Sequence, residues 1–180
     1  MGSIKILEMG FGTGLNALLT MMEADKYRRS VSYNTVEAFP ISLKSAQSLN
    51  YLDVLNIEKY RTQFDSMHSS DSLDQLRLSK YFSFRKHLCK IEDLIPQENY
   101  NVVYYDAFAP TTQPELWDEA MMKRIYDLLD EEAVFVSYCA KGSFKRALKA
   151  AGFIVEALPG PPGKREMTRA IKRQLQSGNA

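Results

Sequence analysis

The pattern of apolar and polar positions along the chain predicts strands that alternate with helices. Short runs of apolar and β-branched residues predict strands, whereas apolar residues three or four positions apart predict amphipathic helices. The predicted strands lie at residues 4–7, 31–36, 84–91, 101–105, 133–138, 153–158 and 167–171. The predicted helices lie at residues 15–22, 114–129 and 141–151, and Pro40 is expected to open a further helix. Strands that alternate with helices are typical of an α/β fold with a mostly parallel sheet.

Three stretches add detail to this pattern. The run 101–105 is apolar and β-branched, as expected of a central strand that is buried on both faces. The last two strands are joined by the proline-rich segment 159–166, and we expect them to form an antiparallel hairpin. Residues 66–72 are polar and are predicted to be a loop, so His68 is expected to be a surface or packing residue.

A glycine-rich turn joins the first predicted strand to the first predicted helix. Gly10, Gly12 and Gly14 stand at alternate positions after Glu8. Glycine takes positive φ freely and leaves room for a ligand against the backbone, and the helix N-terminus that follows favours a nucleotide-like group. An acidic residue ahead of the glycines suits a cationic or hydroxyl-rich ligand better than a pyrophosphate. The stretch resembles the turn that holds S-adenosylmethionine (SAM) in Rossmann-like methyltransferases, and a tight turn without a ligand is the alternative.

Two carboxylates stand at the ends of predicted strands. Glu37 follows the second strand, 23 residues after Gly14. In a doubly wound sheet, ligands bind at the carboxyl ends of the strands, and an acidic residue about twenty positions past the glycines takes the ribose hydroxyls. Glu37 is therefore the candidate ribose ligand, with an exposed strand-end carboxylate as the alternative. Asp106 follows the predicted central strand, where reacting groups would meet.

Length and composition restrict the class of protein. A chain of 180 residues with 45% hydrophobic residues can bury one good core, so we expect a single domain over residues 1–180. No apolar run approaches the ~20 residues of a membrane span, and no signal peptide precedes the first strand, so no membrane partner is expected. Cys89 and Cys139 stand alone and are expected to be reduced, which favours a cytoplasmic protein. The two Cys and two His lack the spacing of a metal site, so no metal is expected.

The net charge of +1 conceals a basic C-terminal third. Residues 141–173 hold nine Lys or Arg and two Glu, a charge of +7, which leaves −6 for the rest of the chain. Such an asymmetry predicts an acidic partner bound on one side of the protein. A solvated helix face followed by a basic terminal strand is the alternative.

Four parts of the sequence together resemble the bacterial MnmC methyltransferase domain, whose stand-alone form is called MnmD. They are residues 10–16 (GFGTGLN), 106–110 (DAFAP) with 114–117 (PELW), 138–142 (YCAKG) and 160–167 (GPPGKREM). The resemblance covers nearly the whole chain, and the last three parts are specific in combination. It implies a Rossmann-like SAM-dependent (class I) methyltransferase with a mostly parallel seven-stranded sheet and an antiparallel C-terminal strand.

The resemblance also implies a reaction. SAM would donate a methyl group to the exocyclic amine of 5-aminomethyl-2-thiouridine at the tRNA wobble position, giving 5-methylaminomethyl-2-thiouridine. Asp106 matches the catalytic aspartate of the family. A carboxylate can accept a hydrogen bond from a neutral amine, orient its lone pair and stabilise the positive charge that develops. An aspartate that only caps the following loop is the alternative.

Further site residues follow from the resemblance and the charge. Methyltransferases of this class often place an acidic residue near the adenine amino group, and Glu92 is the candidate, although Asp93 beside it leaves the choice open. The expected tRNA contacts are the basic residues Lys141, Lys164 and Arg165. The expected cofactor residues are Glu8, Gly10, Gly12, Gly14, Asn16, Glu37, Glu92 and Asp106.

The family pattern also differs from this chain at its ends. Family members have further residues before the first strand, so an N-terminal extension is expected to be missing here. The flavin-dependent oxidase domain of MnmC is expected to be absent as well, and a separate oxidoreductase would then supply the aminomethyl substrate.

Two other classes of function remain as alternatives. Polyamine aminopropyltransferases also set a strand-end acidic residue against a substrate amine, and they use a decarboxylated relative of SAM. The basic C-terminal third argues against them, because it would repel a polycationic substrate. A ligand-binding module without catalysis is disfavoured because the glycines, Glu37 and Asp106 are all present.

Overall fold

The computed structural model describes residues 2–70, 75–160 and 162–173. The chain divides into two compact units, Met1–Ile95 and Pro96–Ala180. Among the described residues, each unit holds four β-strands. The single domain over residues 1–180 stays a prediction.

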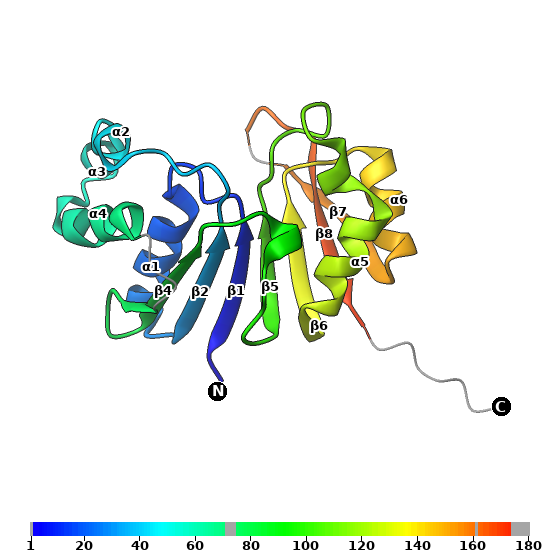
Figure 1. The fold of residues 1–180 in the computed structure, drawn as a ribbon, viewed down its shortest axis with the longest axis horizontal. Helices are drawn as coiled ribbons and strands as arrows, with labels where there is room; N and C mark the ends of the chain where they lie inside the picture. The colour runs from blue at the N-terminus through cyan, green and yellow to red at the C-terminus, as the bar shows by residue number, and fades with distance from the viewer. Residues whose placement is uncertain (1, 71–74, 161, 174–180) are drawn as a thin grey trace. The chain divides into compact units, whose positions relative to one another are not determined.

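The strands of the first unit stand in the order β3-β4-β2-β1 (Figure 1). Strands β1, β2 and β4 are parallel, and the two-residue β3 pairs antiparallel with β4. The register sets Val36 beside both Met9 and His87, so the carboxyl ends of three parallel strands are level at one edge. The strands are β1 (Ile4–Met9), β2 (Val31–Val36), β3 (Leu76–Arg77) and β4 (Phe82–His87).

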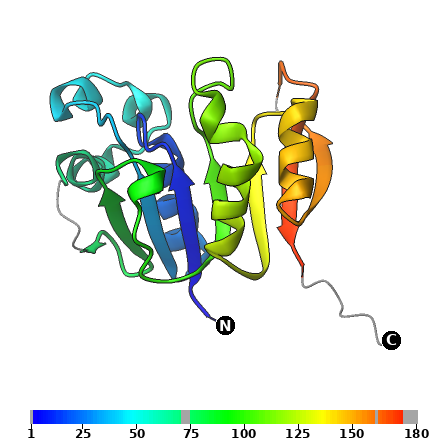
Figure 2. The ribbon, with the colours of Figure 1, turned by 45° about the vertical axis from the view of Figure 1, so that its right-hand side comes forward.

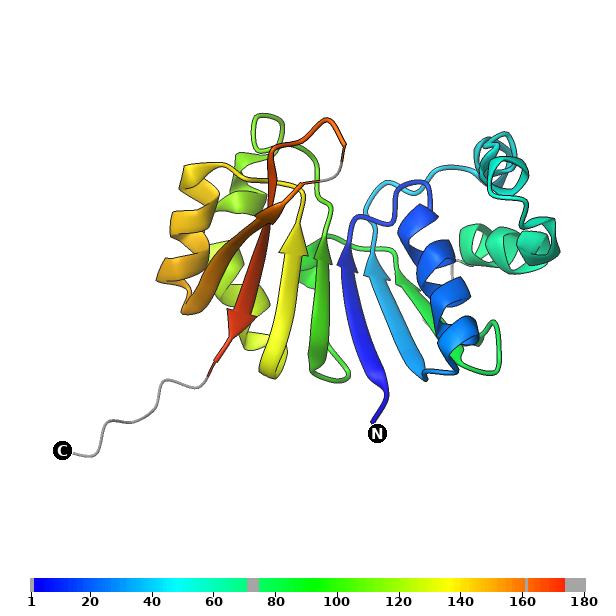
Figure 3. The same ribbon diagram turned by 180° about the vertical axis from the view of Figure 1, so that it is seen from behind.

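Helix α1 (Leu15–Tyr27) begins directly after the glycine turn and covers the face of the first unit's sheet that Figure 3 turns to the viewer. It buries Ala17, Leu18 and Met21, which stand three or four positions apart, against that sheet. Arg28 ends it in the left-handed conformation. The other helices of the unit are α2 (Leu43–Gln47), α3 (Tyr51–Val54), η1 (Glu58–Tyr60), α4 (Arg61–Ser69) and η2 (Ile91–Asp93).

Two predictions for the first unit are wrong. Pro40 does not open a helix, because α2 begins three residues later, with the Ser42 hydroxyl accepting the N–H of Ser45 at 3.1 Å as its cap. The predicted loop at 66–72 is helical as far as Ser69, and residues 71–74 lie outside the described residues. The loop is predicted because the segment is mostly polar, yet α4 buries three residues on one helix face, Phe64, Met67 and His68.

The strands of the second unit stand in the order β5-β6-β8-β7. Strands β5 and β6 are parallel, whereas β8 pairs antiparallel with both β6 and β7. The terminal hairpin is therefore present as predicted, with β8 lying between β6 and β7. The strands are β5 (Tyr100–Tyr105), β6 (Leu129–Ser137), β7 (Phe153–Pro159) and β8 (Glu166–Lys172).

Helices α5 (Glu119–Asp127) and α6 (Gly142–Ala150) cover one face of the second unit's sheet (Figure 2). The helix predicted at 114–129 is interrupted: η3 (Pro114–Trp117) ends at Asp118, whose side chain accepts the N–H of Met121 at 2.8 Å and caps α5. Ring centroids 4.9 to 6.4 Å apart mark the aromatic core of this unit, which consists of Tyr105, Trp117, Phe135 and Phe144.

Each of the seven predicted strands is present, with bounds shifted by a few residues. The described residues hold one additional strand, β3, which is too short to give a pattern in the sequence. Within the part of the chain that the structure describes, no helix is long and apolar enough to cross a membrane.

Candidate functional site

The turn between β1 and α1 is built from three glycines with positive φ. Gly10, Gly12 and Gly14 have φ of 88°, 53° and 76°, values that other residues adopt only with strain. The N–H of Gly10 donates to Val36 O at 3.0 Å, and the N–H of Gly14 donates to Phe11 O at 2.9 Å. The turn is therefore fixed by its own backbone and by the neighbouring strand β2.

The second and third glycines meet different surroundings. A Cβ on Gly12 would meet nothing within 4 Å, and Gly12 is exposed, so its backbone is open to a ligand. A Cβ on Gly14 would stand 2.9 Å from both His68 Nε2 and Phe11 Cζ. Gly14 is thus required by internal packing, whereas the position of Gly12 leaves space that a ligand can use.

Glu37, the residue after β2, bonds to the glycine turn. Its carboxylate accepts the N–H of Gly12 at 2.9 Å and the N–H of Phe39 at 2.7 Å, and the residue is 8% exposed. A carboxylate offers about four lone-pair sites, so two bonds leave capacity for hydroxyl groups of a ligand. The structure brings Glu37 to the glycine turn, and its role as the ribose ligand stays a prediction.

Glu8 and Asn16 meet underneath the turn. Glu8 is fully buried, and its Oε1 accepts the Asn16 side-chain N–H at 3.1 Å. This bond ties the end of β1 to the first turn of α1.

Glu92 lies exposed in η2, next to Asp93, and the choice between these two for the adenine stays open.

The helices after β2 hold the glycine turn at Thr13. The Tyr51 hydroxyl, from α3, donates to Thr13 Oγ1 at 2.9 Å. His68 Nε2, from α4, lies 3.3 Å from Thr13 O, so the ring carries its proton on Nε2 in this contact. Sequence reasoning gave no role to Tyr51 and set His68 in a loop, because nothing in the local pattern points from either residue to the turn.

A buried lysine supports α4. Lys86 is 2% exposed, and its ammonium donates to Met67 O at 2.9 Å and to His68 O at 2.8 Å, at the C-terminal end of the helix. Burial lowers the pKa of His68, and the charge of Lys86 adds to that effect, while the hydrogen bond to Thr13 opposes it. A neutral His68 keeps the Nε2 proton that Thr13 accepts.

In the second unit, Asp106 follows β5 and is exposed. The side chain makes no hydrogen bond or ion pair with the residues that the structure describes, so its oxygens are available to a substrate. The loop after it is held by two side chains at consecutive carbonyls. Tyr138 O–H donates to Ala107 O at 3.0 Å, and Trp117 Nε1–H donates to Phe108 O at 2.8 Å.

The expected tRNA contacts also lie in the second unit. Lys141 is the residue before α6, and Lys164 and Arg165 stand in the turn between β7 and β8; all three are exposed. Pro161, within the quoted 160–167 segment, lies outside the described residues. Four other basic residues of the C-terminal third lie beside carboxylates: Lys145–Glu166, Arg169–Glu156, Lys172–Glu131 and Arg173–Glu132.

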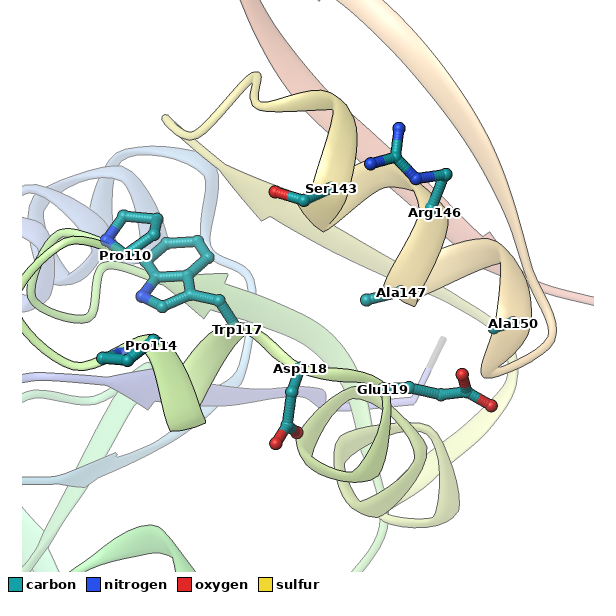
Figure 4. Close-up of a pocket in the computed structure, with 9 residues that line it drawn as sticks. All are labelled: Pro110, Pro114, Trp117, Asp118, Glu119, Ser143, Arg146, Ala147 and Ala150. Atoms are coloured by element: carbon teal, nitrogen blue, oxygen red, sulfur yellow. The ribbon is translucent and has the colours of Figure 1, made fainter.

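An open pocket of about 490 Å³ lies between the loop after β5 and helix α6 (Figure 4). Pro110, Pro114 and Trp117 form one wall, and Ser143 and Arg146 stand on the opposite wall, with the Ser143 hydroxyl turned toward Pro110. The remaining lining residues are Asp118, Glu119, Ala147 and Ala150. The pocket thus sets the Ser143 hydroxyl across from an apolar wall, beside the loop that carries Asp106.

Comparison with known proteins gives a family and two sets of relatives. A family model described as S-adenosyl-L-methionine-dependent methyltransferase matches residues 54–173. The tRNA 5-methylaminomethyl-2-thiouridine biosynthesis bifunctional protein MnmC of Marinomonas sp. (strain MWYL1) is 31% identical over 176 residues, covering 91% of this chain and 25% of that protein. The protein of the same name from Acinetobacter baylyi is 31% identical over 179 residues, covering 91% and 28%. The chain spans about a quarter of the length of these curated relatives.

Solved structures share the fold. The crystal structure of MNMC2 from Aquifex aeolicus matches with a TM-score of 0.77 at 22% identity, covering 94% of this chain and 53% of that one. Spermidine synthase from Thermotoga maritima matches with a TM-score of 0.56 at 19% identity, covering 94% and 54%. The predicted Rossmann-like class I fold is therefore confirmed.

Proposed function

The chain belongs to the family of S-adenosyl-L-methionine-dependent methyltransferases, and we propose that it methylates the exocyclic amine of 5-aminomethyl-2-thiouridine at the tRNA wobble position. It is an enzyme, and SAM is its cofactor. One observation carries the choice of substrate: relatives named for biosynthesis of the methylated nucleoside match about nine tenths of this chain.

The glycine turn fits SAM. The exposed backbone of Gly12, with open space where a Cβ would stand, can lie against the cofactor. Glu37 retains acceptor capacity for the ribose hydroxyls, and Glu92 is the proposed residue for the adenine. Glu8, Gly10, Gly14 and Asn16 hold the turn in shape. SAM supplies a methyl group on a positively charged sulfur, which makes the methyl carbon electrophilic.

Asp106 acts on the substrate amine. The nitrogen lone pair forms the new N–C bond while the C–S bond breaks and its electron pair stays on sulfur. The Asp106 carboxylate accepts a hydrogen bond from the amine N–H, directs the lone pair at the methyl carbon and stabilises the positive charge on nitrogen. The extra proton then leaves nitrogen for Asp106 or water. Tyr138 and Trp117 fix the loop behind the carboxylate, which keeps it in position.

The charge of the second unit suits an RNA substrate. Lys141, Arg146, Lys149, Lys164 and Arg165 form no ion pair with a carboxylate among the described residues, so they are available to phosphates. The same cations oppose a polyamine substrate, and the likeness to spermidine synthase extends to the fold alone. A tRNA substrate would set the enzyme in the cytoplasm, and a separate oxidoreductase would provide the aminomethyl nucleoside.

The test is a methylation assay on defined tRNA. tRNA from a strain that accumulates 5-aminomethyl-2-thiouridine is incubated with the protein and SAM, and its nucleosides are analysed by mass spectrometry. The proposal expects conversion of the amine to the methylamine, with no product from the same tRNA lacking the aminomethyl group. Aminopropyl transfer from decarboxylated SAM to putrescine, with no methylation of tRNA, would contradict it.

A further inference from the structure

Lys164 lies on Tyr138 in the second unit. The Lys164 ammonium is 4.3 Å from the centroid of the Tyr138 ring, a cation–π distance. The hydroxyl of the same tyrosine donates to Ala107 O, the residue after Asp106. Tyr138 therefore bonds to the Asp106 loop and carries Lys164 on its face. Figure 3 shows the turn between β7 and β8 and the loop after β5 at the same end of the second unit's sheet.

The charges around Lys164 come from three elements. Asp106 precedes Ala107, whose carbonyl accepts the Tyr138 hydroxyl, and burial together with the negative charge of Asp106 raises the pKa of that hydroxyl. On the turn itself, Arg165 adds a cation, and Glu166 is engaged by Lys145 of α6 at 2.7 Å. Lys164 itself forms no ion pair with a carboxylate of the described residues, so its charge is not neutralised locally.

The proposed reaction needs a neutral amine. A primary alkylamine resembles a lysine side chain, whose pKa of about 10.4 makes it an ammonium near pH 7. An ammonium has no lone pair and cannot attack. A carboxylate beside the amine raises its pKa further, so Asp106 alone would favour the unreactive form. A cation close to the same amine has the opposite effect.

We propose that Lys164, docked on the tyrosine that bonds to the Asp106 loop, lies near the target amine and electrostatically favours the neutral form of that amine. This inference rests on the proposed function, because the amine is that of the tRNA substrate. Lys164 offsets the electrostatic effect of Asp106, while Asp106 keeps its role as hydrogen-bond acceptor. Arg165, which is adjacent and also exposed, has no such ring contact among the described residues, and we expect it to bind phosphate.

The test is the pH dependence of single-turnover methylation, with SAM and substrate tRNA saturating. The variants are Lys164→Met and Lys164→Arg, with Arg165→Met as the matched control for loss of one positive charge from the same turn. Lys164→Met should move the rising limb of the pH–rate profile to higher pH by about one unit, because the amine then loses its proton less readily. This shift corresponds to an about tenfold lower rate at pH 7. Lys164→Arg should keep the limb near its original pH. Arg165→Met should weaken tRNA binding and leave the limb unchanged.

Tyr138→Leu removes the docking ring and should shift the limb in the same direction as Lys164→Met, with SAM affinity showing that the protein is folded. If Lys164→Met and Arg165→Met both weaken tRNA binding and neither shifts the limb, Lys164 is a phosphate contact and the inference is wrong. Wild-type protein that methylates no tRNA would instead overturn the proposed function, and the inference with it.

Discussion

The carboxylate of Glu37 accepts the backbone N–H of Gly12 at 2.9 Å, so the end of β2 holds the turn that follows β1. The residue predicted to bind the ribose thus also fixes the shape of the surface on which the cofactor would lie. Loss of the carboxylate should therefore affect binding in two ways, through the ribose and through the turn.

Glu37→Gln tests this double role. Both oxygens of the Glu37 carboxylate accept a backbone N–H, from Gly12 and Phe39. The glutamine amide can accept only one of these bonds with its oxygen, and its NH₂ group would face the other N–H, donor against donor. Losing a hydrogen bond to a charged group costs roughly 1.5–3 kcal/mol, so SAM affinity should fall about ten- to a hundredfold in calorimetry. Glu23→Gln, on the exposed face of α1, is the control and should leave affinity unchanged. Equal affinity of Glu37→Gln and wild type would remove Glu37 from the site.

The two later glycines of the turn should respond differently to alanine. Gly14→Ala sets a methyl group 2.9 Å from His68 and Phe11 and also bears the strain of a positive φ, so the free energy of unfolding should fall by about 2–5 kcal/mol. Gly12→Ala meets open space, so stability should change by about 1–2 kcal/mol at most, from the positive φ alone. For Gly12→Ala, the loss in the free energy of SAM binding should exceed the loss in the free energy of unfolding. Denaturant unfolding and calorimetry on both variants check this, and a reversed order of stabilities would contradict the packing argument.

Asp106→Asn tests the mechanism. The amide keeps the shape and one acceptor oxygen but cannot stabilise a forming ammonium or take its proton. Single-turnover methylation with saturating SAM and tRNA should fall by at least ~100-fold, nearly as far as in Asp106→Ala. SAM binding should be largely retained in both. Near-normal turnover of Asp106→Asn would mean that the aspartate only shapes its loop.

Binding of tRNA should weaken steeply with salt. Replacing Lys141 and Arg146 by Gln removes two cations that have no carboxylate partner among the described residues, and the salt slope should fall by about one for each lost phosphate contact. Arg169→Gln is the control, because Arg169 donates to Glu156 at 2.8 Å. It should leave the slope nearly unchanged. Filter binding over a range of salt checks this, and a flat response of the wild type would favour a small-molecule substrate.

The stability of the protein should decrease below pH 6.5. Burial holds the pKa of His68 below its ordinary value of 6.5, so the unfolded chain binds this proton more readily. The stability that comes from neutral His68 is complete above pH 6.5 and is lost as the pH falls toward the lowered pKa. His68→Gln keeps an N–H for Thr13 O and should flatten this part of the profile in thermal unfolding between pH 8 and 5. His87, whose pKa burial also lowers, accounts for the slope that remains.

The sequence predicts the strands, the glycine turn and the position of Glu37 because each depends on local pattern or short spacing. The bond from Gly12 to Glu37 follows from strand register, whereas the spacing of 23 residues from Gly14 points only to Glu37 as a ribose ligand. Lys86 and Tyr51 give no such signal, because their contacts depend on where the short helices α3 and α4 pack, which no local pattern fixes. Tyr138 belongs to the segment 138–142, which resembles the family, yet its contact with Lys164 joins the residue after β6 to a distant turn and cannot be seen in either stretch alone.

The contacts of Tyr51 and His68 with Thr13 have a consequence for ligand-dependent order. Thermodynamic coupling is reciprocal, so if residues 51–69 fix the turn that receives SAM, then SAM must stabilise those residues to the same extent. The amide hydrogens of α3 and α4 should therefore exchange more slowly with deuterated water when SAM is bound, although neither helix carries a predicted cofactor ligand. The same coupling implies that substitutions in this segment can adjust cofactor affinity in related proteins without any change in the glycine turn.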